Sequence, residues 1–362
     1  MSRWHWALAP ALVLCLSAAL AAAEGLDQTG NPGLKSAGPL AFGPKGVLFI
    51  GDPIGAQIVA IGLPSGESTP IGADFKLDGL NDKLGALLGV AASDIRVNDV
   101  AVEPASKVAY VSVARGSGPN ADAAIVTVDG KGNLKPLALE KVQYAKIEIA
   151  NAPAPGAADK KGRNLRSTAI TDLAYVDGKL YIAGMSNEEF ASKLRSVAFP
   201  FKSADTGTSV EILHTAHGAA IETRAPVQTF VPFNVGGEPQ ILAAYTCTPL
   251  VTFPVKALEP GKKIRGTTVA ELGNGNQPLD MIIYEKGGKT YLLLSNSRRG
   301  VMKITTDAIE KQNLTAAVTG GGKAGLSYET IDALKDVAQL DKLSANNALV
   351  LAGGNLQAIA LP

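Results

Sequence analysis

The chain has 362 residues, of which 46% are apolar and only 5% aromatic, so its length and composition suit a large core of aliphatic side chains. The formal net charge of +1 disfavours a nucleic acid or an anionic membrane as a partner bound through bulk charge. Two cysteines are too few for a disulfide framework.

The first 23 residues have the pattern of a secretion signal. Arg3 precedes an apolar run at 7–22, and three alanines stand before Glu24, where a signal peptidase would cut. No later stretch approaches the roughly 18 uninterrupted apolar residues of a membrane span. We therefore predict a soluble exported protein, periplasmic or secreted and without a membrane anchor, whose mature part is residues 24–362.

Removing this segment changes the inventory of reactive side chains. It takes away both tryptophans, Cys15 and one of the three histidines, so Cys247, His214 and His217 are the thiol and imidazoles that remain. Arg3 is its only formal charge, so the 34 basic residues become 33, equal to the 33 acidic ones. A single thiol excludes an internal disulfide, although an exported compartment would permit one.

The mature chain repeats a unit of short β-rich runs. In the clearest copy, an apolar run at 173–176 meets the turn pair Asp177-Gly178, a second run follows at 180–183, and a third begins near Leu194. Successive copies start 54–73 residues apart, the length of a four-stranded propeller blade with its loops. The six copies begin at Leu40, Val100, Leu173, Val227, Met281 and Val337.

These repeats predict an all-β chain that folds as a single six-bladed β-propeller with short helical inserts. Outer strands are expected at 135–139, 209–213, 267–272 and 314–318, whereas the last copy lacks one. We expect residues 34–37 to supply that missing strand and close the ring. Residues 77–92 predict a short helix and residues 152–166 an exposed loop. The alternative is seven blades, with the seventh hidden in residues 73–97.

Two segments carry a family resemblance. Residues 48–61, L-F-I-G-D-P-I-G-A-Q-I-V-A-I, resemble the second and third strands of an NHL-type blade, and residues 171–184, T-D-L-A-Y-V-D-G-K-L-Y-I-A-G, are similar to the first and second. This resemblance to the β-propeller superfamily covers nearly the whole mature chain and departs from the WD type, because no Trp remains. Such propellers include lactonases, dehydrogenase subunits and plain binding scaffolds, so the resemblance implies a fold and does not select an activity.

Topology places many polar residues on one rim. In an antiparallel meander, the loop between strands two and three shares a rim with the connection to the next blade, so a site is expected there. The second hairpins contribute Asp52, Arg115, Met185, Asn187, Cys247, Asn296, Arg298 and Arg299. The inter-blade connections contribute His214, His217, Glu222, Arg224, Asn274, Asn276 and Gln277.

Two groups of residues are candidates for ligand binding. Aspartates near the start of innermost strands can face the axial channel, or can cap backbone amides. Paired guanidinium groups can clamp a carboxylate or phosphate, or can form a solvated hairpin tip. The candidates are Asp99, Asp172, Asp280, Asn296, Arg298 and Arg299.

The segment H-T-A-H-G predicts a metal site. Side chains three apart point together in a turn, and Gly218 favours a turn. With Cys247 and Glu222 on the same rim, the ligand types suit Cu or Zn, and the ligand atoms of His214, His217 and Cys247 are expected within about 4 Å of one another. The alternative is that Cys247 fills space as a small hydrophobic residue.

Two classes of function fit this pattern. The first is an exported propeller that acts as a binding or accessory scaffold for a small-molecule ligand, a metal ion or a protein partner. The second is an enzyme. A lactonase-like hydrolase would hold a divalent cation such as Ca at the channel carboxylates, whereas a redox protein would use His214, His217 and Cys247.

Overall fold

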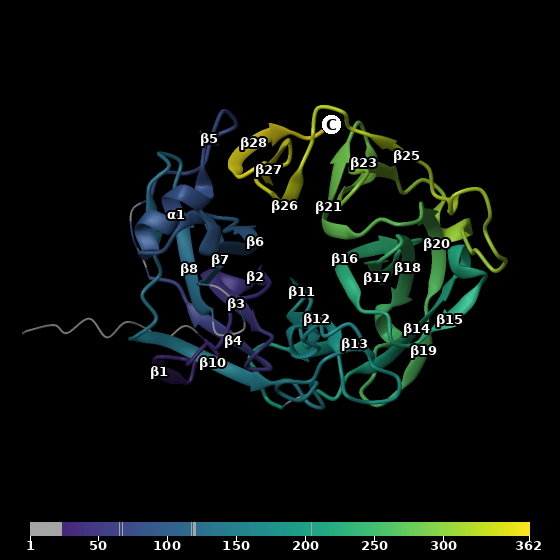
Figure 1. Ribbon diagram of the computed structural model, residues 1–362, viewed down its shortest axis with the longest axis horizontal. Coiled ribbons are helices and arrows are strands. Elements are labelled where there is room, and N and C mark those ends of the chain that lie inside the picture. Colours follow the sequence, from purple (N-terminus) through teal and green to yellow (C-terminus); the bar gives the residue numbers. More distant parts are fainter. Residues whose placement is uncertain (1–23, 65, 67, 117, 119–120, 204) are drawn as a thin grey trace, which may run out of the picture.

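The computed structural model describes residues 24–362 except 65, 67, 117, 119–120 and 204, so the predicted signal at 1–23 lies outside the described residues. Six β-sheets stand around a central axis as the blades of a propeller (Figure 1). The predicted all-β, six-bladed architecture is confirmed. We number the blades 1–6 by the order in which their innermost strands occur in the chain.

Blades 1–3 hold the N-terminal half of the chain. From the axis outward, blade 1 contains β2 (Leu40–Phe42), β3 (Val47–Asp52), β4 (Gln57–Gly62), β10 (Val142–Glu148) and β1 (Gln28–Gly30). Blade 2 contains β6 (Ile95–Val102), β7 (Ala109–Arg115), β8 (Asp122–Val128) and β9 (Leu134–Pro136). Blade 3 contains β11 (Asp172–Val176), β12 (Lys179–Met185), β13 (Ser192–Ala198), β14 (Thr208–His214) and β15 (Ala220–Glu222), with β19 (Lys263–Arg265) parallel to β14.

Blades 4–6 follow the same plan. Blade 4 contains β16 (Val227–Val235), β17 (Glu238–Tyr245), β18 (Pro249–Pro254), β20 (Thr267–Leu272) and β24 (Lys323–Gly325). Blade 5 contains β21 (Pro278–Lys286), β22 (Lys289–Asn296), β23 (Gly300–Thr305) and β25 (Tyr328–Thr330). Blade 6 contains β26 (Val337–Lys342), β27 (Asn347–Ala352), β28 (Asn355–Ala360) and β5 (Lys76–Leu77).

Helical structure is confined to short inserts. The α-helix that the structure describes, α1 (Leu80–Leu88), contacts β6 and β9 of blade 2. Within the described residues, no helix is both long and apolar enough to cross a membrane. The 3-10 turns are η1 (Pro44–Gly46), η2 (Ala92–Asp94), η3 (Arg166–Thr168), η4 (Thr215–His217), η5 (Val255–Ala257) and η6 (Ile309–Lys311).

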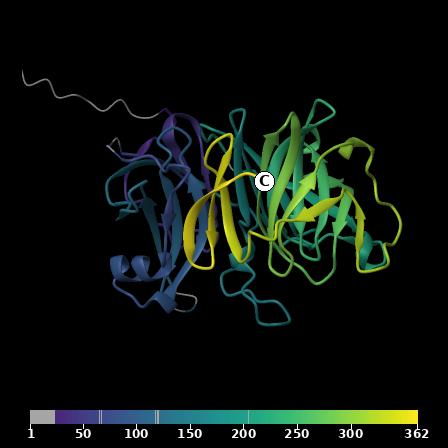
Figure 2. The ribbon, with the colours of Figure 1, turned by 90° about the horizontal axis from the view of Figure 1, so that it is seen from above.

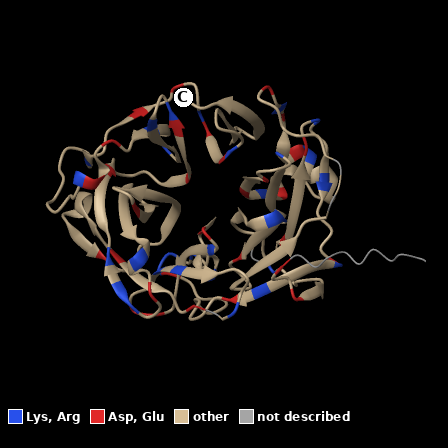
Figure 3. Cartoon of the chain, turned by 180° about the vertical axis from the view of Figure 1, so that it is seen from behind, with Lys and Arg blue, Asp and Glu red and all other residues tan. Residues whose placement is uncertain are grey.

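The hydrophobic core lies between the faces of neighbouring blades. One buried cluster joins blades 3, 4 and 5, and another joins blades 2 and 6 with α1. Successive side chains of a strand point to opposite faces, and inner strands such as β3 and β4 are buried at nearly every position, so both of their faces contribute to the core. On the face shown in Figure 3, basic and acidic residues are interspersed around the ring, in keeping with the balanced charge of the sequence.

The blades do not follow the chain order around the ring. Contacts between innermost strands run from β2 to β11, β16, β21, β26, β6 and back to β2, so blade 2 lies between blades 6 and 1. In the edge-on view of Figure 2, the yellow C-terminal strands of blade 6 stand between blue blade 2 and green blade 5. The chain forms the inner strands of blade 1, then blade 2, and returns past blade 1 before it forms blades 3–6.

Blades 1 and 6 are each completed by a strand from a distant part of the sequence. β10 pairs with β4 and completes blade 1. β5 pairs with β28, with Leu77 opposite Leu356 and Lys76 opposite Gln357, and completes blade 6. Residues 76–77 therefore close blade 6, and the prediction that residues 34–37 supply this strand is wrong.

Residues 34–37 cannot close blade 6 because their neighbour Asp52 holds them on blade 1. Asp52 is fully buried at the end of β3. Its carboxylate accepts hydrogen bonds from the backbone N–H groups of Lys35 and Ser36, both at 2.9 Å, and from the Ser36 hydroxyl at 2.7 Å. These bonds hold the N-terminal segment on blade 1. Leu77, only 7% exposed, instead joins the buried cluster that contains Leu356.

Most of the other predicted elements are confirmed. Each of the six predicted copies begins within an innermost strand, α1 lies within the predicted helix at 77–92, and β9, β14 and β20 overlap three of the predicted outer strands. The outer strand predicted at 314–318 is wrong, because β25 occupies that place in blade 5. The seventh blade is also wrong, because residues 73–97 form β5, α1, η2 and the start of β6.

An engineered disulfide tests the closure. In a Cys247→Ser background, Lys76→Cys combined with Gln357→Cys should form a crosslink, because residues opposed across antiparallel strands lie about 4.5–5.5 Å apart at Cα. Non-reducing electrophoresis and thiol titration measure it. The control pair Ser36→Cys with Gln357→Cys should stay reduced, and crosslinking of the control pair alone would contradict the closure by β5.

Candidate metal centre

The two mature histidines come together because a strand ends in a tight turn. Buried and partly exposed residues alternate along β14, and His214 at its end falls on the buried side. η4 follows, and Gly218 at φ 73° adopts the left-handed conformation that lets the chain turn back into β15. The turn brings His217 over His214, with the rings stacked at 3.7 Å between centroids and 29° between planes.

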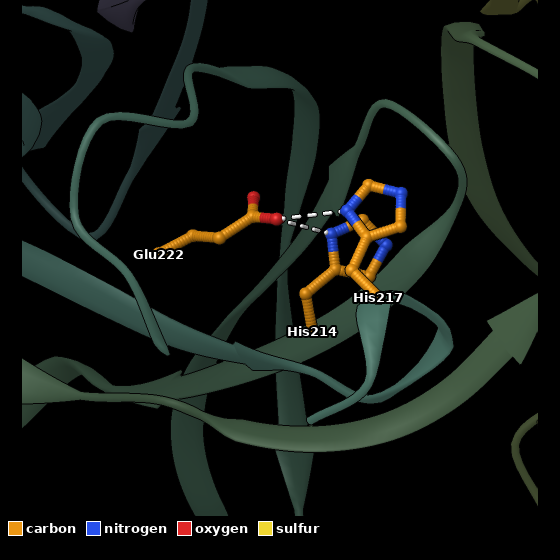
Figure 4. Close-up of side chains that lie close together, drawn as sticks. All are labelled: His214, His217 and Glu222. Atoms are coloured by element: carbon orange, nitrogen blue, oxygen red, sulfur yellow. Dashed lines mark hydrogen bonds and ion pairs between the residues drawn. The ribbon is translucent and has the colours of Figure 1, made fainter. Parts of the chain in front are cut away.

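Glu222 completes the group from the returning strand. Its Oε1 accepts hydrogen bonds from Nδ1 of His214 at 2.9 Å and from Nδ1 of His217 at 3.0 Å (Figure 4). The hydrogen bond from His214 holds the pKa of Glu222 below its ordinary value, and the bond from His217 acts in the same direction. The His214 side chain is 1% exposed and the His217 side chain 46%, so the group has a buried side and an open side.

These three residues have the spacing of metal ligands. One ligand atom from each of His214, His217 and Glu222 lies within 4.8 Å of the other two, and this is the one such group of His, Cys, Asp or Glu in the described part of the chain. Cys247 does not belong to it. The sequence therefore predicted the three nitrogen and oxygen donors correctly as neighbours, but not the thiol.

Cys247 is held elsewhere by its backbone. It lies in the turn between β17 and β18 at φ 63°, and its N–H donates to the carbonyl oxygen of Asn276 at 2.7 Å. This bond ties the hairpin tip to the connection between blades 4 and 5, whereas the histidines lie at the outer edges of blades 3 and 4. The predicted approach of Cys247 to both imidazoles within about 4 Å is wrong in this structure.

Glu271 of β20 lies on the buried side of the histidine pair and was missed by the sequence analysis. Its Oε1 accepts hydrogen bonds from the Thr215 hydroxyl at 2.8 Å and the Ala216 N–H at 3.0 Å. Its Oε2 lies 3.9 Å from Nε2 of His214, and neither of these buried atoms has a hydrogen-bond partner among the described residues. A carboxylate within the apolar run of β20 is the sequence signal that could have found it.

The candidate aspartates join neighbouring blades at the axis. Asp99, Asp172 and Asp280 each accept the N–H of the following residue at one oxygen and an N–H of the neighbouring innermost strand at the other, all at 2.7–2.8 Å. Asp341, which the sequence analysis missed, does the same with Lys342 and Val102. The capping interpretation therefore describes what these side chains contact.

Burial shifts the titration of these carboxyl groups. It raises the pKa of Asp99 to about 7 and the pKa of Asp172 and Asp341 to about 6, and it raises the pKa of Asp280 well above its ordinary value. Neighbouring carboxylates in the ring raise the pKa of Asp99 and Asp280 further. Among the described residues, the ligand atoms of these aspartates do not form a group of three within 4.8 Å, and cation binding at the axis stays a prediction.

The candidate arginines contact different neighbours. Arg298 and Asn296 line a cavity of about 310 Å³ between blades 5 and 6, together with Lys335 and Asp336. Arg299 instead donates from Nη2 to the Asn274 carbonyl oxygen at 3.0 Å. The predicted joint clamp of the two guanidinium groups on one ligand is not formed in this arrangement, and anion binding by Arg298 stays a prediction.

The rim itself is assembled as the topology predicts. Asn276, in the connection between blades 4 and 5, donates from its amide to Oδ1 of Asn296 at 2.9 Å and accepts the N–H of Arg298 at 3.1 Å. The Gln277 carbonyl accepts the N–H of Ser297 at 2.9 Å. Inter-blade connections and second hairpins therefore meet on one rim.

Comparison with known proteins finds similarity in structure, with low scores. No family model and no curated protein matches the chain. Its structure is similar to extracellular domains 1–2 of Drosophila semaphorin 1b, with 11% identity, TM-score 0.39 and coverage of 92% of this chain and 86% of the other. It is also similar to two sugar dehydrogenases.

The first is a putative oxidoreductase (glucose dehydrogenase) from Thermus thermophilus, with 13% identity and TM-score 0.36. The match covers 89% of this chain and 93% of the other. The second is the PQQ-bound aldose sugar dehydrogenase of Streptomyces coelicolor, with 13% identity, TM-score 0.37 and coverage of 92% and 97%. These TM-scores are too low for any of the three likenesses to carry an argument about function.

The raised pKa values of the channel aspartates predict a pH dependence of stability. Their folded-state pKa values, about 7 for Asp99 and about 6 for Asp172 and Asp341, exceed the unfolded values, so the native state binds more protons over this range. The free energy of unfolding should therefore rise as the pH falls from about 8 to about 5. Urea denaturation at several pH values measures it.

The matched control is Asp99→Asn, which removes one of these titrating groups. Its free energy of unfolding should vary less with pH over the same range, although the loss of one acceptor lowers its overall stability. A wild-type stability that falls steadily from pH 8 to about 5 would contradict the raised pKa values.

Proposed function

We propose that this protein is an exported β-propeller that binds a transition-metal ion through His214, His217 and Glu222. The observation that carries the proposal is the convergence of two imidazole nitrogens and a carboxylate oxygen within 4.8 Å at the outer edge of blade 3. Export rests on the sequence of residues 1–23, which predicts a secretion signal.

The donor set favours Zn²⁺ or Cu²⁺. Imidazole nitrogen suits both ions, and carboxylate oxygen is a common third ligand of Zn²⁺. Calcium is disfavoured because it takes about six to eight oxygen ligands, and this group offers one carboxylate. Cys247 lies outside the group, so the preference of thiolate for softer ions such as Cu(I) does not apply here.

The distances suit an ion in place of the shared hydrogen bonds. The Nδ1–Oε1 separations of 2.9 and 3.0 Å need to widen by only about 0.3–0.5 Å to reach the spacing of tetrahedral metal–ligand bonds of about 2.0–2.1 Å. Three protein ligands leave a fourth position of a tetrahedral site for water or a small ligand. His217 is 46% exposed, which places this position on the solvent side.

The open fourth coordination position is compatible with both classes of function. A binding scaffold would hold a small-molecule ligand or a protein side chain on the ion, whereas an enzyme would activate water there. The described residues around the group include no further imidazole or thiol ligand. We propose metal-dependent binding as the function, because the 46% exposed side chain of His217 gives solvent and ligands access to the ion.

Calorimetric titration of the chelator-treated mature protein with Zn²⁺ and Cu²⁺ tests the proposal. We expect one ion per chain, and His217→Ala should weaken binding more than ~10-fold with little change in folding, because this side chain is largely exposed. Circular dichroism checks the fold. Cys247→Ser should bind the ion as the wild type does, because the thiol lies outside the group.

Two matched carboxylate variants separate the site from nonspecific charge. Glu222→Gln should weaken binding, whereas Glu238→Gln should not, because Glu238 pairs with Lys256 away from the group. Equal affinity of the wild type, His217→Ala and Glu222→Gln would refute the proposed site.

A further inference from the structure

The buried side of the histidine pair holds an unmatched contact. Nδ1 of His214 donates to Glu222, and a neutral imidazole carries a single N–H, so Nε2 then presents a lone pair. That lone pair faces Oε2 of Glu271, a second acceptor, at 3.9 Å. His214 and Glu271 are each 1% exposed, and buried polar atoms without partners are uncommon in native proteins.

A metal ion on Nδ1 removes this mismatch. Coordination needs the lone pair of Nδ1, so the single proton of His214 moves to Nε2. Nε2–H can then donate to Oε2 of Glu271, directly after a small approach or through one water molecule. The two unpartnered atoms of the metal-free arrangement thereby become a donor and an acceptor.

The Glu271 carboxylate is already fixed for this role. Oε1 accepts two hydrogen bonds, from the Thr215 hydroxyl and from the Ala216 N–H, which leaves Oε2 directed toward His214. Both donors belong to the segment between the two histidines. The carboxylate therefore holds the backbone of the turn with one oxygen and faces an imidazole ligand with the other.

We propose that Glu271 is a positioning residue for the metal site, which selects the Nε2–H tautomer of His214 and so presents Nδ1 to the ion. The proposal rests on the proposed metal-binding function. Metal-bound histidines commonly donate their other N–H to a carboxylate, which orients the ring and raises its basicity. Glu271 comes from blade 4, whereas the three ligands come from blade 3, so the site is completed across the boundary between two blades.

The decisive variant is Glu271→Gln. The amide oxygen can keep the bonds from Thr215 and Ala216, but the NH₂ group at the other position donates and cannot accept Nε2–H. That donor favours the opposite tautomer, with the proton on Nδ1. Affinity for Zn²⁺, measured by competition with a chromophoric chelator, should fall about 10–100-fold while the circular dichroism spectrum is retained.

Thr215→Val is the control for a merely structural role. It removes one bond to Oε1 but leaves Oε2 free to accept from His214, so it should lower thermal stability and change Zn²⁺ affinity less than Glu271→Gln does. If the wild type binds Zn²⁺ and Glu271→Gln binds it equally, the positioning role is refuted and the metal site stands. If the wild type binds neither Zn²⁺ nor Cu²⁺, both proposals fail.

A measurement on the wild type keeps the test independent of variant folding. Long-range ¹H–¹⁵N NMR spectra of the Zn²⁺-loaded protein report which ring nitrogen of His214 carries the proton. We expect a protonated Nε2 and a metal-bound Nδ1. A metal-bound Nε2, or a proton retained on Nδ1, would overturn the inference even where Zn²⁺ binds tightly.

Discussion

Four aspartates on the innermost strands, Asp99, Asp172, Asp280 and Asp341, connect neighbouring blades at the axis. Each carboxylate accepts one N–H from its own strand and one from the strand of the neighbouring blade. These bonds cross four of the boundaries between adjacent innermost strands. One of the four is the boundary between blades 6 and 2, where Asp341 accepts the N–H of Val102. They therefore fix the spacing of these blades at the axis.

The hydrogen bonds to these carboxylates stabilise the ring, whereas the burial of their negative charge destabilises it. Two hydrogen bonds per carboxylate favour the charged form, but burial and mutual repulsion favour the neutral form more strongly, as the raised pKa values of Asp99 and Asp280 show. Burial is the largest cause at Asp99, Asp172 and Asp280, and neighbouring carboxylates add to it at Asp99 and Asp280. A carboxylate offsets this electrostatic cost because its two oxygens can accept N–H groups from two strands at the same time.

The sequence predicted the blades well and their order poorly. Apolar runs separated by turn pairs such as Asp177-Gly178 are local signals, and they located every innermost strand. The place of β5 depends on Leu77 meeting Leu356, a contact across 279 residues that no local pattern encodes. Asp52 illustrates the same limit, because three of its five hydrogen bonds hold residues 35 and 36 on blade 1 and leave the closing role to β5.

At the candidate site, the sequence again predicted the local contacts and missed the distant ones. Gly218 marks the turn that stacks His217 on His214, so the sequence alone was enough to predict that the two imidazoles lie together. Glu271 was not predicted because its strand carries a register shift opposite Leu250 and Val251, which breaks the alternation that assigns side chains to faces. Asp341 was not predicted because it lies inside the last copy, after Val337, whereas Asp99, Asp172 and Asp280 each stand directly before the first residue of a copy.

The boundary between blades 3 and 4 is therefore held at two radii. At the axis, Asp172 accepts the N–H of Phe230 in β16. At the outer edge, Glu271 of β20 accepts the N–H of Ala216, and the Thr268 hydroxyl donates to the Leu213 carbonyl oxygen at 2.7 Å. An ion bound by the 214–222 hairpin would act on the outer contacts, because its ligands are close in sequence and order only a short segment. The bond between Asp172 and Phe230 at the axis involves none of these ligands, so under the proposed function an ion would change the outer contacts and leave this inner contact in place.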